Sequence, residues 1–136
     1  MQVIALVCAI AEDERKQGGA SSAPHLVVAP VSTLDNWQRE FRAWAPHMRV
    51  VKYHGPQAGR VELQQRAEEA GFDVLLTTYS YFEGDGAGNR DDRSWMRRFS
   101  WGLCVVDEAH MLKSAASSRS TRLSHLRAKQ RLLLTG

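Results

Sequence analysis

The stretch Leu103-Cys-Val-Val-Asp-Glu-Ala-His110 decides the fold, because an apolar run ends there in two adjacent carboxylates. A short continuous apolar run is typical of a strand buried on both faces of a parallel sheet. Ligands of open parallel sheets bind at the carboxyl ends of the strands. We therefore expect Asp107 to hold a Mg²⁺ ion through water against the phosphates of a nucleotide. Glu108, on the opposite side of the chain, is expected to orient or deprotonate the attacking water.

The same residues also have a plainer interpretation as helix caps. Acidic side chains are favourable near helix N-termini, so Asp107, Glu108 and His110 would then only cap the segment after the strand. The four letters Asp-Glu-Ala-His are weakly specific by themselves. The apolar run before them and Met-Leu-Lys113-Ser after them favour the functional interpretation.

The apolar pattern outward from this stretch alternates between short runs and helical spacing, which predicts an α/β fold with a parallel sheet and helices on both faces. Gly71 is expected to end a helix as its C-cap. The polar, glycine-rich segment 84–92 is expected to be a surface loop. The expected strands cover 25–29, 49–53, 73–78, 101–106 and 130–134, and the expected helices 1–13, 34–44, 61–70, 95–99 and 119–128.

Large aromatic residues are expected to pack in the core rather than to stack on a ligand. Trp37, Phe41 and Trp44 recur at helical spacing after Ser32 or Thr33, either of which is placed to N-cap that helix. Other tryptophans, Trp95 and Trp101, fall within a predicted helix and strand.

Composition bounds the class of protein. The chain has 136 residues, which fits a single domain, and 43% of them are hydrophobic. Its apolar runs are far shorter than the roughly 20 residues that a membrane span requires, so no membrane partner is expected. The net charge of +3 is compatible with a polyanionic partner but decides little. Cys8 and Cys104 lie in apolar stretches, which predicts buried thiols in a reducing compartment.

The ordered motifs resemble those of one family. The tetrad Asp107 to His110 resembles motif II of superfamily-two helicases and translocases, and 131–136 resembles the start of motif III in its SWI/SNF-type form. The stretch 26–41 is similar to motif Ia, and Leu75-Leu-Thr-Thr-Tyr79 is similar to motif Ib. The wording of 32–37, 91–94 and 110–113 is closest to the SMARCAD-type chromatin remodellers.

This resemblance implies a RecA-like (P-loop NTPase) lobe that uses ATP and Mg²⁺ in a nuclear motor stepping along duplex DNA, with nucleosomes as its expected setting. Short hydroxyl side chains near helix starts contact phosphates without reading sequence, so binding is expected to be sequence-tolerant. The plainer interpretation makes Ser32 an ordinary N-cap and the threonines ordinary strand residues. The implied roles are catalysis for Asp107, Glu108 and His110, nucleotide contact for Gln2 and Asp107, DNA contact for Pro30, Ser32, Thr33, Thr77, Thr78, Tyr79 and Lys113, and coupling for Thr135 and Gly136.

The family pattern is incomplete in residues 1–136. A glycine-rich Walker A loop, whose amides and Lys cradle the phosphates, precedes a segment like 1–6 in the family, and a second RecA-like lobe follows motif III. The chain is therefore expected to be a partial ATP-binding domain that is inactive in isolation, from an internal methionine start or a truncated gene model.

Two other functions remain open at this point. An RNA helicase of the DExH type is the nearest enzymatic alternative, although Pro30-Val-Ser-Thr-Leu34 differs from the Pro-Thr-Arg-Glu form of such proteins. The alternative from another class is a non-catalytic module that binds DNA or a protein partner.

Overall fold

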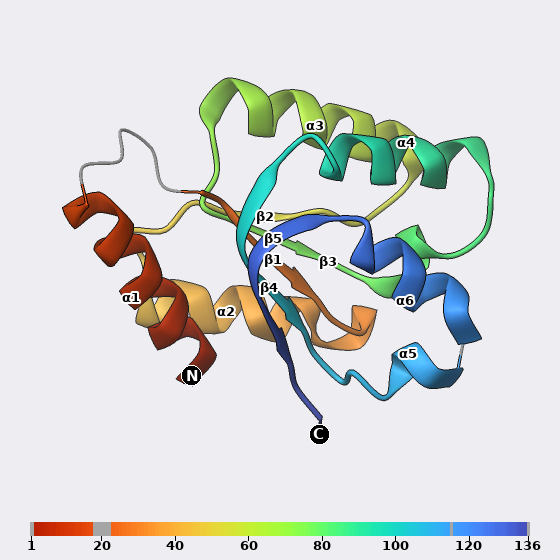
Figure 1. The fold of residues 1–136 in the computed structure, drawn as a ribbon. Coiled ribbons are helices and arrows are strands. Elements are labelled where there is room, and N and C mark those ends of the chain that lie inside the picture. Colours follow the sequence, from red (N-terminus) through yellow and green to blue (C-terminus); the bar gives the residue numbers. More distant parts are fainter. Residues whose placement is uncertain (1, 18–22, 115, 136) are drawn as a thin grey trace.

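The computed structural model describes residues 2–17, 23–114 and 116–135, and it is organised around one sheet (Figure 1). Five strands, all parallel, lie in the order β2-β3-β1-β4-β5. The α/β, parallel-sheet prediction is confirmed. The strands are β1 (His25–Val28), β2 (Val50–Lys52), β3 (Val74–Thr77), β4 (Ser100–Val106) and β5 (Arg127–Leu133).

Helices cover both faces of this sheet, as predicted (Figure 1). One face packs against α1 (Gln2–Lys16) and α2 (Leu34–Trp44). The other face packs against α3 (Gln57–Ala70), α4 (Ala87–Met96) and α6 (Ala116–Ser124). The remaining helical pieces are α5 (Met111–Ser114) and the 3₁₀ turns η1 (Val31–Thr33) and η2 (Tyr79–Phe82).

Strand β4 explains why a continuous apolar run is needed at the centre of the sheet. Leu103 and Val105 pack in the cluster under α1 and α2, whereas Cys104 and Val106 pack in the cluster on the other face. Successive side chains of a strand point to opposite faces, so a strand covered on both faces needs apolar residues at every position. Cys104 is a free, buried thiol.

The strand order also fixes where a ligand can bind. From β1 the chain leads through α2 to β2 at one edge of the sheet, and from β4 it leads through α6 to β5 at the other edge. The connections therefore diverge between β1 and β4, and a crevice forms at the carboxyl ends of such a pair of strands. Asp107 directly follows β4, and Pro30 is the second residue after β1.

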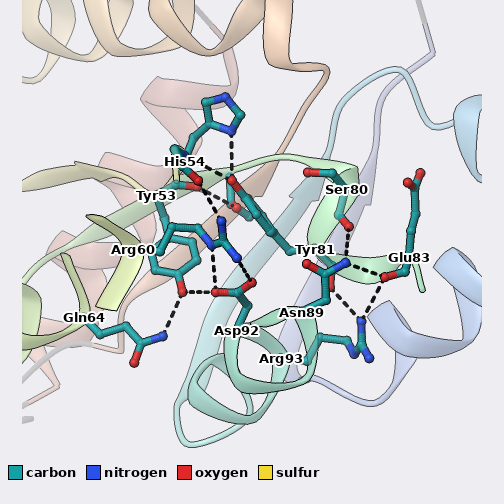
Figure 2. A network of polar contacts seen from close by, with 12 residues as sticks. Tyr53, His54, Arg60, Gln64, Ser80, Tyr81, Glu83, Asn89, Asp92 and Arg93 are labelled. Carbon is teal, nitrogen blue, oxygen red and sulfur yellow. Dashed lines mark hydrogen bonds and ion pairs between the residues drawn. The ribbon is translucent and has the colours of Figure 1, made fainter. Parts of the chain in front are cut away.

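The prediction of a surface loop over 84–92 is wrong, because α4 begins at Ala87 and runs to Met96. Asp92 lies on the inner side of this helix, where its carboxylate binds the Arg60 guanidinium at 2.9 Å, as Figure 2 shows. The Tyr53 hydroxyl donates to the same carboxylate. A charged residue is buried here because it is paired, and its partner lies far away in the sequence. Hydrophobic spacing therefore could not reveal the helix.

Other boundaries differ by a few residues. The first helix extends to Lys16, and α3 begins at Gln57 rather than at Val61. Of the expected basic helix 95–99 only residues 95 and 96 are helical, as the end of α4. The predicted helix 119–128 ends at Ser124, and β5 starts at Arg127. Strand β5 pairs with β4 alone, so its mostly exposed residues carry no apolar run to mark its start.

Some predictions for single residues are confirmed and others are wrong. Gly71 caps α3 with φ of +78°, a conformation that favours glycine, so that prediction is confirmed. Thr33 stands at the N-cap of α2, but its hydroxyl donates back to the Pro30 carbonyl at 2.9 Å instead of capping the helix. The core prediction for Trp44 is wrong, since this side chain is 57% exposed. None of the helices described has the length and apolarity needed to cross a bilayer.

Candidate active site at the carboxyl edge of the sheet

The segment Asp107–His110, here called the acidic turn, is fastened to the carboxyl ends of the neighbouring strands. The Asp107 amide donates to the Val28 carbonyl at 2.8 Å, and the Ala109 amide donates to the Leu134 carbonyl at 2.7 Å. Strand β4 therefore delivers the turn to the crevice between β1 and β4, where a ligand is expected.

The Asp107 carboxylate is oriented by two hydrogen bonds. The indole Nε1 of Trp37, in α2, donates to Oδ2 at 3.0 Å, and the Glu108 amide donates to Oδ1 at 3.0 Å. Asp107 is half-buried. Each carboxylate oxygen can accept more than one hydrogen bond, so both oxygens retain capacity for a water molecule or an ion.

Glu108 has an unusual backbone. Its φ is +55°, the only positive value at a non-glycine position in the part of the chain that the structure describes. Its side chain is 33% exposed, and its Oε2 lies 3.4 Å from Nδ1 of His110, whose side chain is 60% exposed. The two carboxylates are therefore engaged differently: Asp107 is held by an element of the core, whereas Glu108 contacts an exposed imidazole.

The carbonyl groups of the acidic turn are held by Tyr79. The Tyr79 hydroxyl donates to the Asp107 carbonyl and lies 3.3 Å from the Glu108 carbonyl oxygen. Burial, followed in importance by the nearby Asp107 charge, raises the pKa of Tyr79 to about 12. The phenol therefore stays protonated, and stays a donor, across the physiological pH range.

A hollow of about 420 Å³ lies beside the acidic turn, and it joins the ends of β1 and β3. It brings together four of the residues that the sequence assigned to DNA contact, namely Pro30, Ser32, Thr78 and Tyr79. The rest of its lining is Val31, His54, Ser80, Glu83, Met111 and Arg119. Thr33 is adjacent to this set in the sequence, but its hydroxyl donates to the Pro30 carbonyl.

Two residues assigned to DNA contact have inward-facing hydroxyls. Thr77 has no exposed surface, and its Oγ1 donates to the Tyr53 carbonyl at 3.0 Å. Tyr79 is 2% exposed, and its hydroxyl is directed into the acidic turn. Neither hydroxyl is available to a phosphate in this arrangement.

The remaining candidates are two exposed residues at the ends of the described chain and two that the structure does not describe in full. Gln2 is exposed at the first position of α1, and Thr135 is exposed after β5. The side chain of Lys113 and the whole of Gly136 lie outside the described residues.

The acidic turn fits a magnesium ion better than it fits a metal cage built by protein alone. Among the described residues, no three His, Cys, Asp or Glu side chains lie close enough together to hold a metal ion. Mg²⁺ commonly uses one or two carboxylates together with water and substrate phosphates. Asp107, oriented and half-buried, supplies that kind of ligand.

Sequence reasoning missed two residues of this site. Trp37 was assigned to core packing from its helical spacing, which carries no information about where its indole N–H points. Arg119 belongs to no motif in the sequence, but its side chain is 16% exposed and it bonds the carboxylate of Glu83. Its partner lies 36 positions earlier in the chain, beyond the reach of a local pattern.

Comparison with known proteins gives a consistent assignment. The family model described as the SNF2-related domain matches residues 1–136. The chain is 45% identical over 115 residues to the ATP-dependent helicase FUN30 of Saccharomyces cerevisiae, a match that covers 83% of this chain and 10% of that protein. It is 43% identical over 115 residues to the ATP-dependent helicase fft2 of Schizosaccharomyces pombe, with 83% and 9% covered.

A solved structure is similar in fold as well as in sequence. The Sulfolobus solfataricus SWI2/SNF2 ATPase core in complex with dsDNA matches with a TM-score of 0.68 and 28% identity. The match covers 95% of this chain and 24% of the Sulfolobus chain. This chain thus spans about a tenth of the length of the two fungal relatives and about a quarter of the archaeal core.

Proposed function

The chain belongs to the SNF2-related domain family, and on that premise we propose that it supplies the acidic half of an ATP-hydrolysing centre in a motor that tracks along duplex DNA. The observation that carries the proposal is the acidic turn itself. Asp107 and Glu108 stand at the carboxyl end of a buried central strand, beside the crevice where the sheet connections diverge.

In this proposal the residues of the acidic turn have separate tasks. Asp107, oriented by Trp37 and by the Glu108 amide, holds Mg²⁺ through water. Bound Mg²⁺ would neutralise charge on the β- and γ-phosphates. Glu108 orients the attacking water and accepts its proton. His110, which is close to the Glu108 carboxylate, senses the state of the site.

We assign DNA contact to the rim of the hollow beside the turn. Pro30, Ser32 and Thr78 line it, and short hydroxyl side chains and backbone amides contact phosphates without reading bases. The Sulfolobus relative, which was solved with dsDNA, supports DNA as the polymer. A Drosophila melanogaster relative, 40% identical over 139 residues, is named as a regulator of chromatin and supports chromatin as the setting. We extend this setting to the nucleus, with nucleosomes as the substrate.

In this proposal the other parts of the ATPase lie outside residues 1–136. A phosphate-binding loop, a second RecA-like lobe and its share of the DNA track would complete the centre. This division is consistent with the chain spanning 24% of the Sulfolobus ATPase core. ATP turnover is accordingly expected only when the chain is part of a complete core.

The test is steady-state ATPase activity, with and without duplex DNA, of a polypeptide in which this chain is part of a complete SNF2 core. Glu108→Gln should lower the DNA-stimulated kcat by about 100- to 10,000-fold, because general acid–base catalysis contributes that much. Asp107→Asn should lower the DNA-stimulated kcat by a similar factor. Glu62→Gln, on the exposed side of α3, is the control and should keep full activity. DNA-stimulated turnover that survives both substitutions in the turn would refute the proposal, and stimulation by RNA alone would favour an RNA helicase.

A further inference from the structure

The conformation of Glu108 needs a cause. A left-handed backbone is unfavourable for a residue that carries a Cβ, and it persists only where the surroundings impose it. The Glu108 amide is bound by the carboxylate of Asp107, and the Glu108 carbonyl accepts the Met111 amide at 2.9 Å. These contacts are local to the turn, so they do not by themselves anchor it to the rest of the fold.

The anchor on the carbonyl side is Tyr79. Its hydroxyl donates to the carbonyl of Asp107, which is the peptide group immediately before Glu108, and lies near the carbonyl of Glu108 itself. Fixing the peptide units on both sides of a residue fixes the φ and ψ angles between them. Tyr79 is therefore placed to set the backbone of Glu108, and with it the direction of the Glu108 side chain.

Tyr79 is itself held rigidly. It belongs to the hydrophobic cluster on the α3 and α4 side of the sheet and is 2% exposed. The guanidinium of Arg119 lies over its ring, 5.3 Å from the centroid. Arg119 also bonds the carboxylate of Glu83 and donates to the Met111 carbonyl at 2.8 Å. The ring is thus clamped between the core and a paired, largely buried cation.

The neighbour of Tyr79 faces a different environment. Ser80 is exposed and lines the hollow together with Ser32 and Thr78, whereas the Tyr79 hydroxyl turns into the acidic turn. Adjacent residues of one 3₁₀ turn, η2, therefore face the hollow and the backbone of the candidate catalytic residue. Because Tyr79 belongs to η2, the position of this turn sets the point at which the hydroxyl holds the backbone of Glu108.

We propose that Tyr79 is a positioning residue, which holds the acidic turn so that Glu108 points at the attacking water, and not a DNA contact. This inference rests on the proposed function in one respect, the task of Glu108. The positioning itself is a statement about the backbone of this chain, and it is measurable without ATP.

The test compares Tyr79→Phe with Tyr81→Phe. Each substitution removes one hydroxyl from a buried ring of the same 3₁₀ turn, and Tyr81 is 4% exposed. The Tyr81 hydroxyl contacts Nδ1 of His54 at 3.0 Å (Figure 2). It also accepts the Gly55 amide at 3.2 Å, and none of its hydrogen bonds among the described residues involves the acidic turn. The pair therefore matches the loss of a buried hydroxyl and differs in what that hydroxyl holds.

The first measurement is NMR on the 136-residue chain. Backbone chemical shifts of Glu108 report its left-handed φ, and they should move toward right-handed or extended values in Tyr79→Phe while staying unchanged in Tyr81→Phe. The wild-type chain gives a second reading, in which the Tyr79 hydroxyl proton should exchange slowly with water and show a cross-peak to the acidic turn. Unchanged Glu108 shifts in Tyr79→Phe, or a freely exchanging Tyr79 hydroxyl in the wild type, would overturn the proposal.

The second measurement is the ATPase of the complete core with duplex DNA. Tyr79→Phe should lower kcat by about 10- to 100-fold, because a small misplacement of a reacting group has an effect of that size, and it should leave KM for ATP unchanged. Half-saturation by DNA should also stay unchanged. A weakened DNA half-saturation with intact kcat would restore Tyr79 as a DNA contact. If Glu108→Gln retains turnover while Tyr79→Phe still shifts the Glu108 resonances, the proposed function fails and the positioning stands.

Discussion

Replacing Trp37 by Phe tests the hydrogen bond that orients the candidate metal ligand. Phe keeps an aromatic ring in the position that packs against Phe41, where the two ring centroids are 6.3 Å apart, and removes only the indole edge with its N–H. Trp44→Phe is the matched control. It lies on the same helix and also donates from Nε1 at 3.0 Å, to the Glu40 carboxylate, but it is 57% exposed.

The expected size of the effect follows from the burial of the two pairs. A hydrogen bond to a charged group contributes about 1.5–3 kcal/mol net, and the half-buried state of Trp37 and Asp107 allows water to replace part of it. We therefore expect Trp37→Phe to lower the free energy of unfolding by about 1–2 kcal/mol. The exposed pair of Trp44 and Glu40 is an i,i+4 contact on a helix surface. Trp44→Phe should therefore change the free energy of unfolding by less than about 0.5 kcal/mol.

Urea unfolding of the 136-residue chain measures both numbers, and a double-mutant cycle isolates the hydrogen bond from lost ring packing. In an Asp107→Ala background the acceptor is gone, so Trp37→Phe should cost about 1 kcal/mol less than it does in the wild type. A coupling energy below about 0.3 kcal/mol would refute the reasoning. It would mean that the indole N–H contributes nothing to holding the carboxylate.

Two further predictions concern buried ionisable groups away from the acidic turn. Burial lowers the pKa of His25 below its ordinary 6.5, and its Nδ1 accepts the Leu103 amide. Just below pH 6.5 the unfolded chain therefore binds a proton at His25 that the folded chain does not bind. The free energy of unfolding should therefore be independent of His25 above pH 6.5 and should fall by up to about 1.4 kcal/mol per pH unit below that pH. Urea unfolding at several pH values should show a weaker pH dependence in His25→Asn. Asp92→Asn leaves the buried Arg60 guanidinium without its countercharge and should cost about 3–5 kcal/mol by urea unfolding, whereas Arg60→Met combined with Asp92→Leu should recover most of it. A loss below about 1 kcal/mol in Asp92→Asn would show that water replaces the pairing.

The parts of the fold that sequence could predict are those whose cause is local or periodic. Strand β4 was predicted because both of its faces are buried and each position is apolar. Gly71 was predicted because a left-handed C-cap favours glycine. The acidic pair after β4 was recognised as a candidate site because its residue types and its position at a strand end agree.

The parts that sequence could not predict depend on partners far away in the chain. Helix α4 was missed because its inner face includes a buried carboxylate, that of Asp92. This carboxylate is accommodated by Arg60 of α3, 32 positions earlier, and by the Tyr53 hydroxyl. Trp44 follows the apolar spacing of α2, but it is the last residue of this helix and is 57% exposed. The orientation of the Trp37 indole is set by the location of Asp107, 70 residues later. A pattern within one segment contains none of these relations.

The acidic turn connects the segments that resemble the motifs of the family. The segment resembling motif Ia contributes the Val28 carbonyl, which accepts the Asp107 amide, and the Trp37 indole, which binds the Asp107 carboxylate. The segment resembling motif Ib contributes the Tyr79 hydroxyl, and the segment resembling motif III contributes the Leu134 carbonyl, which accepts the Ala109 amide. Each of these segments thus makes a hydrogen bond to the same four residues. A displacement of α2, of η2 or of the residue that follows β5 therefore acts on the acidic turn without an intermediate element.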